Sequence, residues 1–278
     1  MLNEGTTAYQ SAKDALTQVS GFSLASTYSA LWGVGNEGNK EFIFAFDYQQ
    51  NQASTFYPSV TTGLPKDVNA LFDRTGATMN PWVSSGSNRY GPSEKMINTF
   101  YADLKDSRGD ATFIFLYADN NGGSGYSTYN AAKYRTSILR KFMGEIVDGT
   151  RQAYGNVPLY RYADVLLMLA EAKNMLGEDP STEINAVRKR AYGSNTAPVY
   201  VNSTKDNNTK AILDERLKEF AGEGKRWWDL QRAGSKWVFQ EVATMNAAPI
   251  SGDARKIYLP ITQGMIDRDP NLKQTEGY

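Results

Sequence analysis

Carboxylates and arginines lie close together between residues 215 and 229, and they are the first residues that could do chemistry. The chain contains no cysteine and no histidine. Thiol nucleophiles, disulfides and thiolate metal sites are therefore excluded, and so are the usual general base at neutral pH and the commonest zinc ligand. Ser-His-Asp and Cys-His catalysis cannot be assembled from this chain alone. What remains is the chemistry of paired carboxylates, as in glycoside hydrolases.

A structural role accounts for these charges better than catalysis does. Arg226 and Asp229 are three positions apart, so they can pair on one helix face. Arginine side chains can also bind carbonyl groups left open where Gly222 and Gly224 interrupt a helix. We therefore expect no catalytic residue, no metal and no cofactor, and we interpret a wider set of charges as structural ion pairs. The set is Arg161, Glu171, Arg188, Arg190, Glu215, Arg216, Glu223, Arg226 and Asp229.

A long irregular stretch, residues 47 to 95, carries the residues best suited to binding a ligand. Glycine and proline break it repeatedly, and long ordered loops in compact domains are usually functional. Trp82 and Tyr57 are candidate platforms for sugars, whose C–H faces stack on aromatic rings. Amide and guanidinium groups near Trp82 suit sugar hydroxyls. The predicted ligand-binding residues are Tyr57, Trp82, Asn88, Arg89 and Tyr90.

The overall charge and hydropathy exclude several partners. The 278 residues include 30 lysines and arginines and 30 aspartates and glutamates, so nothing predicts binding to nucleic acid. The longest strongly apolar run, residues 165 to 170, is far shorter than the ~20 residues of a membrane-spanning helix. Residues 119 to 122 faintly resemble a calcium loop but lack its ligand spacing, so we expect a turn there.

The elements that must position these residues are mostly helices. Apolar residues recur on two faces between residues 159 and 175, which predicts a helix packed between neighbours. With the following helix it spans about 34 residues, the length of a tetratricopeptide-type αα-hairpin. Thr209 is the expected cap of the next helix. Further helices are predicted over residues 8–19, 28–32, 95–104, 226–233 and 235–242, and strands over 41–46, 111–118 and 257–259.

Three stretches carry a family pattern. The first is LYRYADVLLMLAEA (159–172) followed by INAVRKRA (184–191), and the second is ILDERLKEFAGEGKRWWDLQR (212–232). The third is LPI (259–261) with DPNLKQTEGY (269–278), where Asp269 replaces the usual asparagine. Their order and spacing resemble the C-terminal portion of the SusD/RagB family of nutrient-binding outer-membrane lipoproteins.

The resemblance implies a mostly α fold, a SusD-like α–α superhelix of tetratricopeptide-like hairpins with a loop-rich lobe and a few short strands. It implies one domain over residues 1–278, with a ligand lobe at about 40–150, a helical core at about 157–245 and a tail at 246–278. It also implies a location on the outer-membrane surface of Bacteroidetes-like bacteria. The lipid anchor would belong to an N-terminal segment absent from this chain.

The expected function is non-catalytic capture of an oligosaccharide or polysaccharide for delivery to a SusC-like TonB-dependent transporter. One alternative is a peptide-binding, RagB-like uptake protein. Two others are a glycoside hydrolase with two catalytic carboxylates, and a helical scaffold that binds only proteins. The resemblance favours a binding protein over an enzyme.

Overall fold

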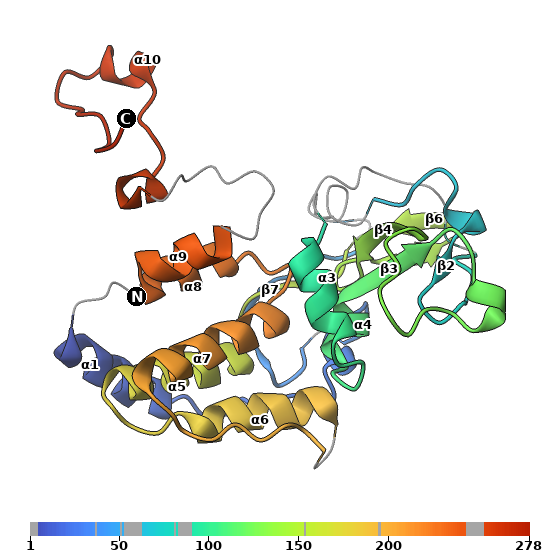
Figure 1. Cartoon of the computed structure of the whole chain (residues 1–278), viewed down its shortest axis with the longest axis horizontal. Helices are drawn as coiled ribbons and strands as arrows, with labels where there is room; N and C mark the ends of the chain where they lie inside the picture. The colour runs from blue at the N-terminus through green and yellow to red at the C-terminus, as the bar shows by residue number, and fades with distance from the viewer. Residues whose placement is uncertain are drawn as a thin grey trace. The chain divides into compact units, whose positions relative to one another are not determined.

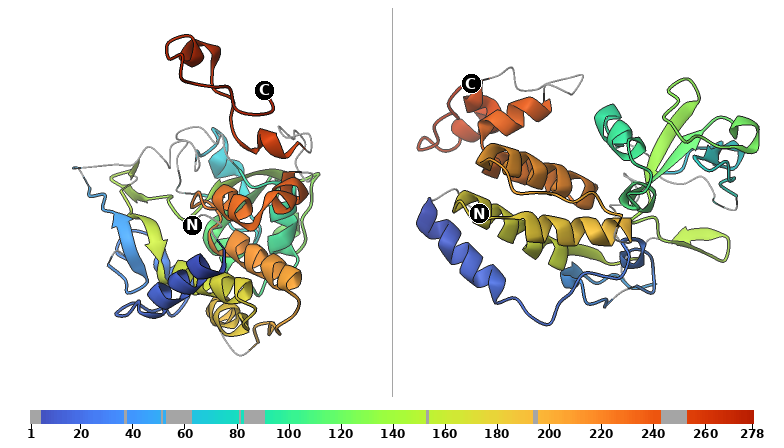
Figure 2. Two further views of the ribbon diagram at one scale, coloured as in Figure 1. Left: turned by 90° about the vertical axis from the view of Figure 1, so that its left-hand side faces the viewer. Right: turned by 60° about the horizontal axis from the view of Figure 1, so that its bottom comes forward.

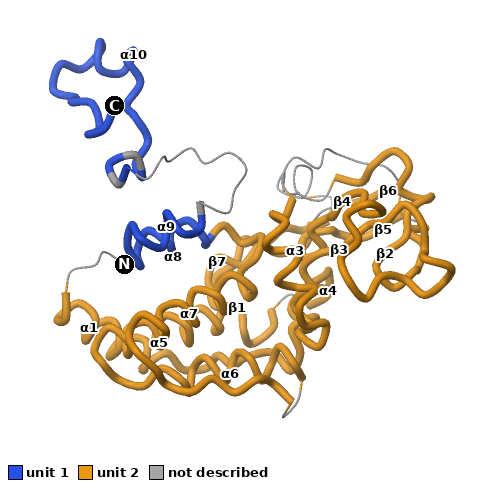
Figure 3. The backbone as a smooth tube through the Cα atoms, in the orientation of Figure 1, with its two compact units in different colours: residues 1–3, 225–278 blue, residues 4–224 orange. Residues whose placement is uncertain are grey.

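The computed structural model describes residues 5–36, 38–50, 52, 63–80, 82, 91–152, 154–193, 196–242 and 253–278. These fall into two compact units (Figure 3). The main unit comprises residues 4–224, and the C-terminal unit comprises residues 1–3 and 225–278. The single domain expected over 1–278, with its lobe, core and tail, stays a prediction.

Four helices form one layer of the main unit. Helix α5 contacts the other three, and the views in Figures 1 and 2 show them side by side. A short loop joins α5 to α6, as in an αα-hairpin. The mostly helical fold with a few short strands that the sequence predicts is confirmed. The four helices are α1 (Thr6–Thr17), α5 (Tyr162–Met175), α6 (Ser181–Tyr192) and α7 (Lys205–Glu219).

Helix α5 is buried on more than one side, as its sequence predicts. Ala163 and Leu167 pack against Val187 of α6 and against Phe220, which directly follows α7. Another face of α5 meets α1. Because its apolar residues lie on more than one face, several neighbouring helices fix its position.

The start of α7 differs from the prediction. The helix begins at Lys205, and the hydroxyl of Thr204 accepts a hydrogen bond from the backbone N–H of Asn207 at 3.3 Å. Thr209, the predicted cap, lies inside the helix and donates its hydroxyl to the carbonyl of Lys205 at 2.8 Å. The earlier threonine has the extended backbone that a cap requires, so it takes this role.

Short antiparallel strands form small sheets in the described part of the main unit. Strand β7 (Val157–Arg161) pairs with β1 (Phe42–Phe46), so residues 159–161 are strand and not helix as predicted, because β1 offers them backbone partners. Strands β5 (Glu145–Val147) and β6 (Thr150–Gln152) form a hairpin. Its turn residues, Asp148 and Gly149, both have positive φ angles, a combination typical of two-residue hairpin turns.

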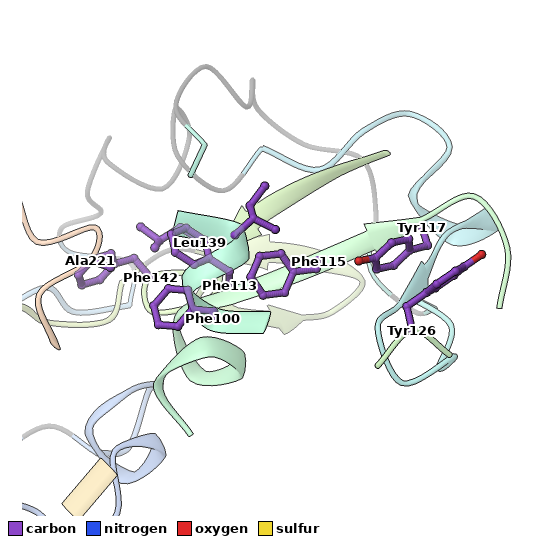
Figure 4. Close-up of a cluster of buried hydrophobic side chains, with 9 residues drawn as sticks. Phe100, Phe113, Phe115, Tyr117, Tyr126, Leu139, Phe142 and Ala221 are labelled. Atoms are coloured by element: carbon purple, nitrogen blue, oxygen red, sulfur yellow. The ribbon is translucent and has the colours of Figure 1, made fainter. Parts of the chain in front are cut away.

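Strand β3 (Phe113–Tyr117) is the centre of a three-stranded sheet and is buried on both faces. Phe113 and Phe115 point to one apolar cluster, which Figure 4 shows, and Ile114 and Leu116 belong to a second. This two-sided burial explains its continuous apolar sequence. Its neighbours are β2 (Phe72–Asp73) and β4 (Tyr134–Leu139), and the adjoining helices are α3 (Glu94–Tyr101) and α4 (Arg108–Thr112).

Single 3₁₀ turns connect several of these elements. They are η1 (Ser29–Leu31), η2 (Val68–Ala70) and η3 (Asn121–Gly123). The last lies in the predicted turn at residues 119–122, where the Asp119 carboxylate accepts the Tyr126 hydroxyl and the Asn121 N–H. Local hydrogen bonds therefore hold this turn together.

The described part of the C-terminal unit contains short helices and an irregular end. The strand predicted over residues 257–259 is wrong: Ile257 ends a 3₁₀ helix, and among the described residues nothing pairs with this stretch as a strand. None of the helices in the described ranges combines the length and apolar character that crossing a membrane requires. The helices of this unit are α8 (Arg226–Ala233), α9 (Ser235–Val242), η4 (Ala254–Ile257) and α10 (Gln263–Ile266).

Candidate functional site

The main unit contains a pocket with a volume of about 650 Å³. This volume is in the range of sites that bind small molecules. Four segments that are distant in the sequence form it: the turn after η1, the connection from α3 into α4 and β3, the end of β4, and Trp82. The lining residues are Ser29, Trp32, Gly33, Trp82, Leu104, Lys105, Ser107, Asp110, Ala111, Ile114, Arg140, Met143 and Gly144.

Trp82 is the one predicted ligand-binding residue that lies within the described structure. It is half-buried, and its ring packs against the apolar cluster that contains Ile114 and Met143. Its backbone N–H donates to the carbonyl of Met79 at 2.9 Å. Trp82 therefore has a supported position at the pocket wall. The other predicted residues, Tyr57, Asn88, Arg89 and Tyr90, lie outside the described residues.

Trp32 is a second aromatic wall of the pocket, and the sequence analysis did not single it out. Its ring makes edge contacts with Tyr28 and Phe142, each with a centroid separation of 5.8 Å. Its indole Nε1 is buried and has no hydrogen-bond partner among the described residues. One signal in the sequence is the glycine that follows it, because Gly33 has a positive φ angle and allows the chain to turn directly after the tryptophan.

The rim of the pocket is polar. Lys105, Ser107 and Arg140 are exposed, and the Asp110 side chain is 45% exposed. The Ser107 hydroxyl donates to the Ala191 carbonyl at 2.5 Å, which ties the rim to helix α6. Two tryptophans with a few convergent polar groups suit a ligand that has both C–H faces and hydroxyls.

Lys141 lies behind Trp32 and supports it. Its Nζ is 4.6 Å from the centre of the Trp32 ring and donates to the Glu223 carboxylate at 2.7 Å. Burial lowers the pKa of Lys141 to about 8, against the opposing attraction of Glu223. The ammonium is therefore charged at neutral pH, and a cation beside an indole ring is worth up to about 2 kcal/mol when desolvated.

Lys141 belongs to a buried network of charges whose centre is Arg161. The Arg161 guanidinium donates to Glu41 at 2.6 Å, to Glu219 at 3.0 Å and to Glu223 at 2.9 and 3.0 Å. All four side chains are at most 1% exposed. Arg161 thus joins the entry of β1, the junction of β7 with α5, and the end of α7.

Two further arginines extend the network to the pocket side of the fold. Arg190 of α6 binds Glu41 at 2.8 Å and also contacts Glu219. Arg108 of α4 donates to Glu215 at 2.7 Å and to Asp106 at 2.6 Å. Because α4 carries pocket residues, these contacts hold the helical layer and the pocket in one arrangement.

The structure places the predicted ion-pair residues with several partners. Arg161 and Glu223 contact each other, and sequence reasoning missed Glu41, Asp106, Arg108, Lys141 and Glu219 because those partners come from distant segments. Glu171 also has an interaction partner. The remaining pairs are Arg188–Glu215, Arg216–Asp164, Arg226–Glu241 and Arg232–Asp229.

The buried glutamates do not have the properties of a glycosidase acid. Burial raises the pKa of Glu219, but Arg190, Arg161 and Arg108 outweigh burial and hold that pKa at about 2. Burial likewise raises the pKa of Glu223, and Arg161 and Lys141 bring it below its ordinary value. A general acid needs a raised pKa and access to substrate. These two carboxylates are ionised and enclosed by arginine side chains, which suits a structural role.

Stability is expected to fall with acid because of Glu219. Its pKa is lower in the folded than in the unfolded chain, so its stabilising contribution is complete above about pH 4.5 and is lost as the pH falls toward 2. Urea unfolding at pH 5 and pH 3 should show a larger loss of unfolding free energy in the wild type than in Glu219→Gln, because glutamine does not titrate. Glu178→Gln, at a partly exposed ion pair with Lys13, should keep the wild-type difference. Equal pH dependence in wild type and Glu219→Gln would contradict the assignment.

Comparison with known proteins places this architecture in a family. The family model described as the SusD family matches residues 40–278. SusD-like protein P38 of Formosa agariphila is 35% identical over 131 residues, which are 44% of this chain and 25% of that protein. The starch-binding protein SusD of Bacteroides thetaiotaomicron is 31% identical over 131 residues, 44% of this chain and 22% of that protein.

A solved structure extends the similarity over nearly the whole chain. A SusD superfamily protein from Bacteroides vulgatus superposes with a TM-score of 0.79 and 29% sequence identity. The superposition covers 99% of this chain and 61% of that protein. The matches thus span about a quarter of the two curated relatives and about three fifths of the solved one.

Proposed function

The chain belongs to the SusD family, and from this premise we propose that it binds glycan in the pocket between Trp32 and Trp82. The observation that carries the proposal is the pocket itself: about 650 Å³ with two indole walls and a polar rim. A similarity to a starch-binding protein supports glycan as the ligand class.

The geometry supports capture without reaction. Indole faces can cover the C–H faces of a sugar, while the rim supplies hydrogen-bond donors and acceptors to its hydroxyls. The carboxylates of the buried network are ionised and enclosed by cations. We expect weak affinity, on the order of micromolar to millimolar, because the contacts lie at an open surface.

The proposed setting is the outer-membrane surface. The protein would be anchored there by lipid through a segment outside this chain, and it would pass its ligand to a SusC-like TonB-dependent transporter. Family membership supports both points. Weak binding suits this role, since a captured glycan must be released to the transporter.

Trp82→Ala is expected to weaken glycan binding about tenfold or more, because it removes one of two stacking faces. The full chain would be screened by calorimetry and affinity electrophoresis against polysaccharides, oligosaccharides and peptides. The matched control is Trp228→Ala, which removes a tryptophan that is 64% exposed and does not line the pocket.

Binding of one glycan class that is weakened by Trp82→Ala and unaffected by Trp228→Ala is the expected result. Binding of peptides alone would favour a RagB-like uptake protein, and turnover of an oligosaccharide would favour a hydrolase. If wild type and Trp82→Ala bind the glycan with equal affinity, the assignment of this pocket as the glycan-binding site is wrong. Absence of binding to every glycan and peptide would leave the protein-binding scaffold and contradict the proposal.

A further inference from the structure

The charges on the pocket rim favour one class of glycan. We propose that the pocket selects acidic glycans and that Lys105 and Arg140 bind their carboxylate or sulfate groups. This inference rests on the proposed glycan binding and adds the substrate class. Three charged side chains line the pocket among the described residues: Lys105, Arg140 and Asp110.

The negative charge among the three is already neutralised. The guanidinium of Arg74 donates from Nε to Asp110 Oδ1 at 2.5 Å, and its Nη2 contacts the second carboxylate oxygen. The Arg74 side chain is only 18% exposed. A two-point contact between guanidinium and carboxylate is a strong, oriented pairing. Asp110 therefore contributes little net negative charge to a ligand in the pocket.

The two positive charges are not neutralised in this way. Within the described ranges, neither Lys105 nor Arg140 forms an ion pair with a carboxylate. Arg140 donates one Nη1 hydrogen bond to the backbone carbonyl of Asp110 at 3.2 Å, which orients the guanidinium and leaves other N–H groups available. Both residues are exposed, so a ligand can reach them.

This local excess of positive charge contrasts with the chain as a whole. The sequence has 30 cationic and 30 acidic residues, so a general positive charge is not the cause. Two cations beside two indole rings match a sugar that has a C–H face and an anionic substituent. Each hydrogen bond between a cation and a ligand anion is expected to change the affinity about tenfold.

The test uses matched pairs of oligosaccharides and the full chain. Uronate oligosaccharides would be compared with the same chains after reduction of the carboxylates to alcohols, and sulfated ones with their desulfated forms. The variant is Lys105→Gln/Arg140→Gln. The control is Lys189→Gln/Lys210→Gln, which changes net charge equally at two exposed lysines that do not line the pocket.

The wild type and the control should bind an acidic form about tenfold or more tightly than its neutral counterpart, with an affinity that falls as sodium chloride is raised. The pocket variant should lose this difference and still bind the neutral form. The matched pair that shows this difference in affinity, uronate or sulfated, identifies the anionic group that the pocket binds. Equal binding of acidic and neutral forms that Trp82→Ala still weakens would overturn this inference and leave the proposed function standing. If no glycan binds, both are wrong.

Discussion

Arg161→Met is expected to lower the free energy of unfolding by about 3–5 kcal/mol, the usual cost of breaking a buried ion pair from one side. Arg161 is fully buried and contacts the carboxylates of Glu41, Glu219 and Glu223. Methionine fills a similar volume without a charge, so these carboxylates would lose their central cation. Urea denaturation followed by tryptophan fluorescence measures the difference.

Two companion variants make this result interpretable. Arg161→Lys keeps the charge and loses the fork-shaped set of donors, so it should be destabilised less than Arg161→Met and stay measurable if the latter does not fold. Lys210→Met removes an exposed pair with Asp214, whose side chains are 65% and 46% exposed, and should change stability by less than about 1 kcal/mol. A loss below about 1 kcal/mol in Arg161→Met would mean that the buried charge network does not stabilise the fold as we propose.

Gly125→Ala is expected to cost about 3 kcal/mol, because it combines backbone strain with a clash. Gly125 has a φ of +64°, and a Cβ there would lie 2.6 Å from the carbonyl carbon of Thr75 and against the carbonyl oxygen of Arg74. The contact is between two backbones, so no side-chain rotation relieves it. Because Arg74 holds Asp110 at the pocket rim, the variant should also weaken glycan binding.

Gly123→Ala is the matched control within the same turn. Its φ is +91°, but a Cβ there meets no atom within 4 Å, so only the strain of about 1 kcal/mol applies. Thermal or urea unfolding of both variants separates the two effects. Equal losses in Gly125→Ala and Gly123→Ala would show that the close approach to Arg74 and Thr75 has no energetic weight.

Helices and core strands could be predicted where the pattern of a segment reflects its own surroundings. The continuous apolar run of β3 and the two-sided pattern of α5 each result from burial on two faces. Residues 159–161 fit a helical pattern but belong to strand β7, because their partner is β1, more than 100 residues earlier in the chain. Pairing at that distance leaves no local periodicity to detect.

The site could be predicted only in part for the same reason. Trp82 is a candidate from the sequence because it is a tryptophan in an irregular stretch broken by glycine and proline. The structure places it at the pocket wall, and its role in binding stays a prediction. Trp32, Lys105 and Arg140 line the same pocket, and the sequence does not indicate this because tertiary folding brings them together from separate segments. The sequence indicates a structural ion pair for Arg161. It does not indicate the partner Glu41, which is 120 positions away in the sequence.

The central claim is that the pocket between Trp32 and Trp82 holds the glycan. A crystal structure of the full chain with the tightest-binding oligosaccharide from the screen tests it most directly. We predict a sugar ring against the Trp82 indole, with its polar groups toward Lys105 and Arg140. An ordered oligosaccharide bound elsewhere, with the pocket empty of sugar, would contradict the account.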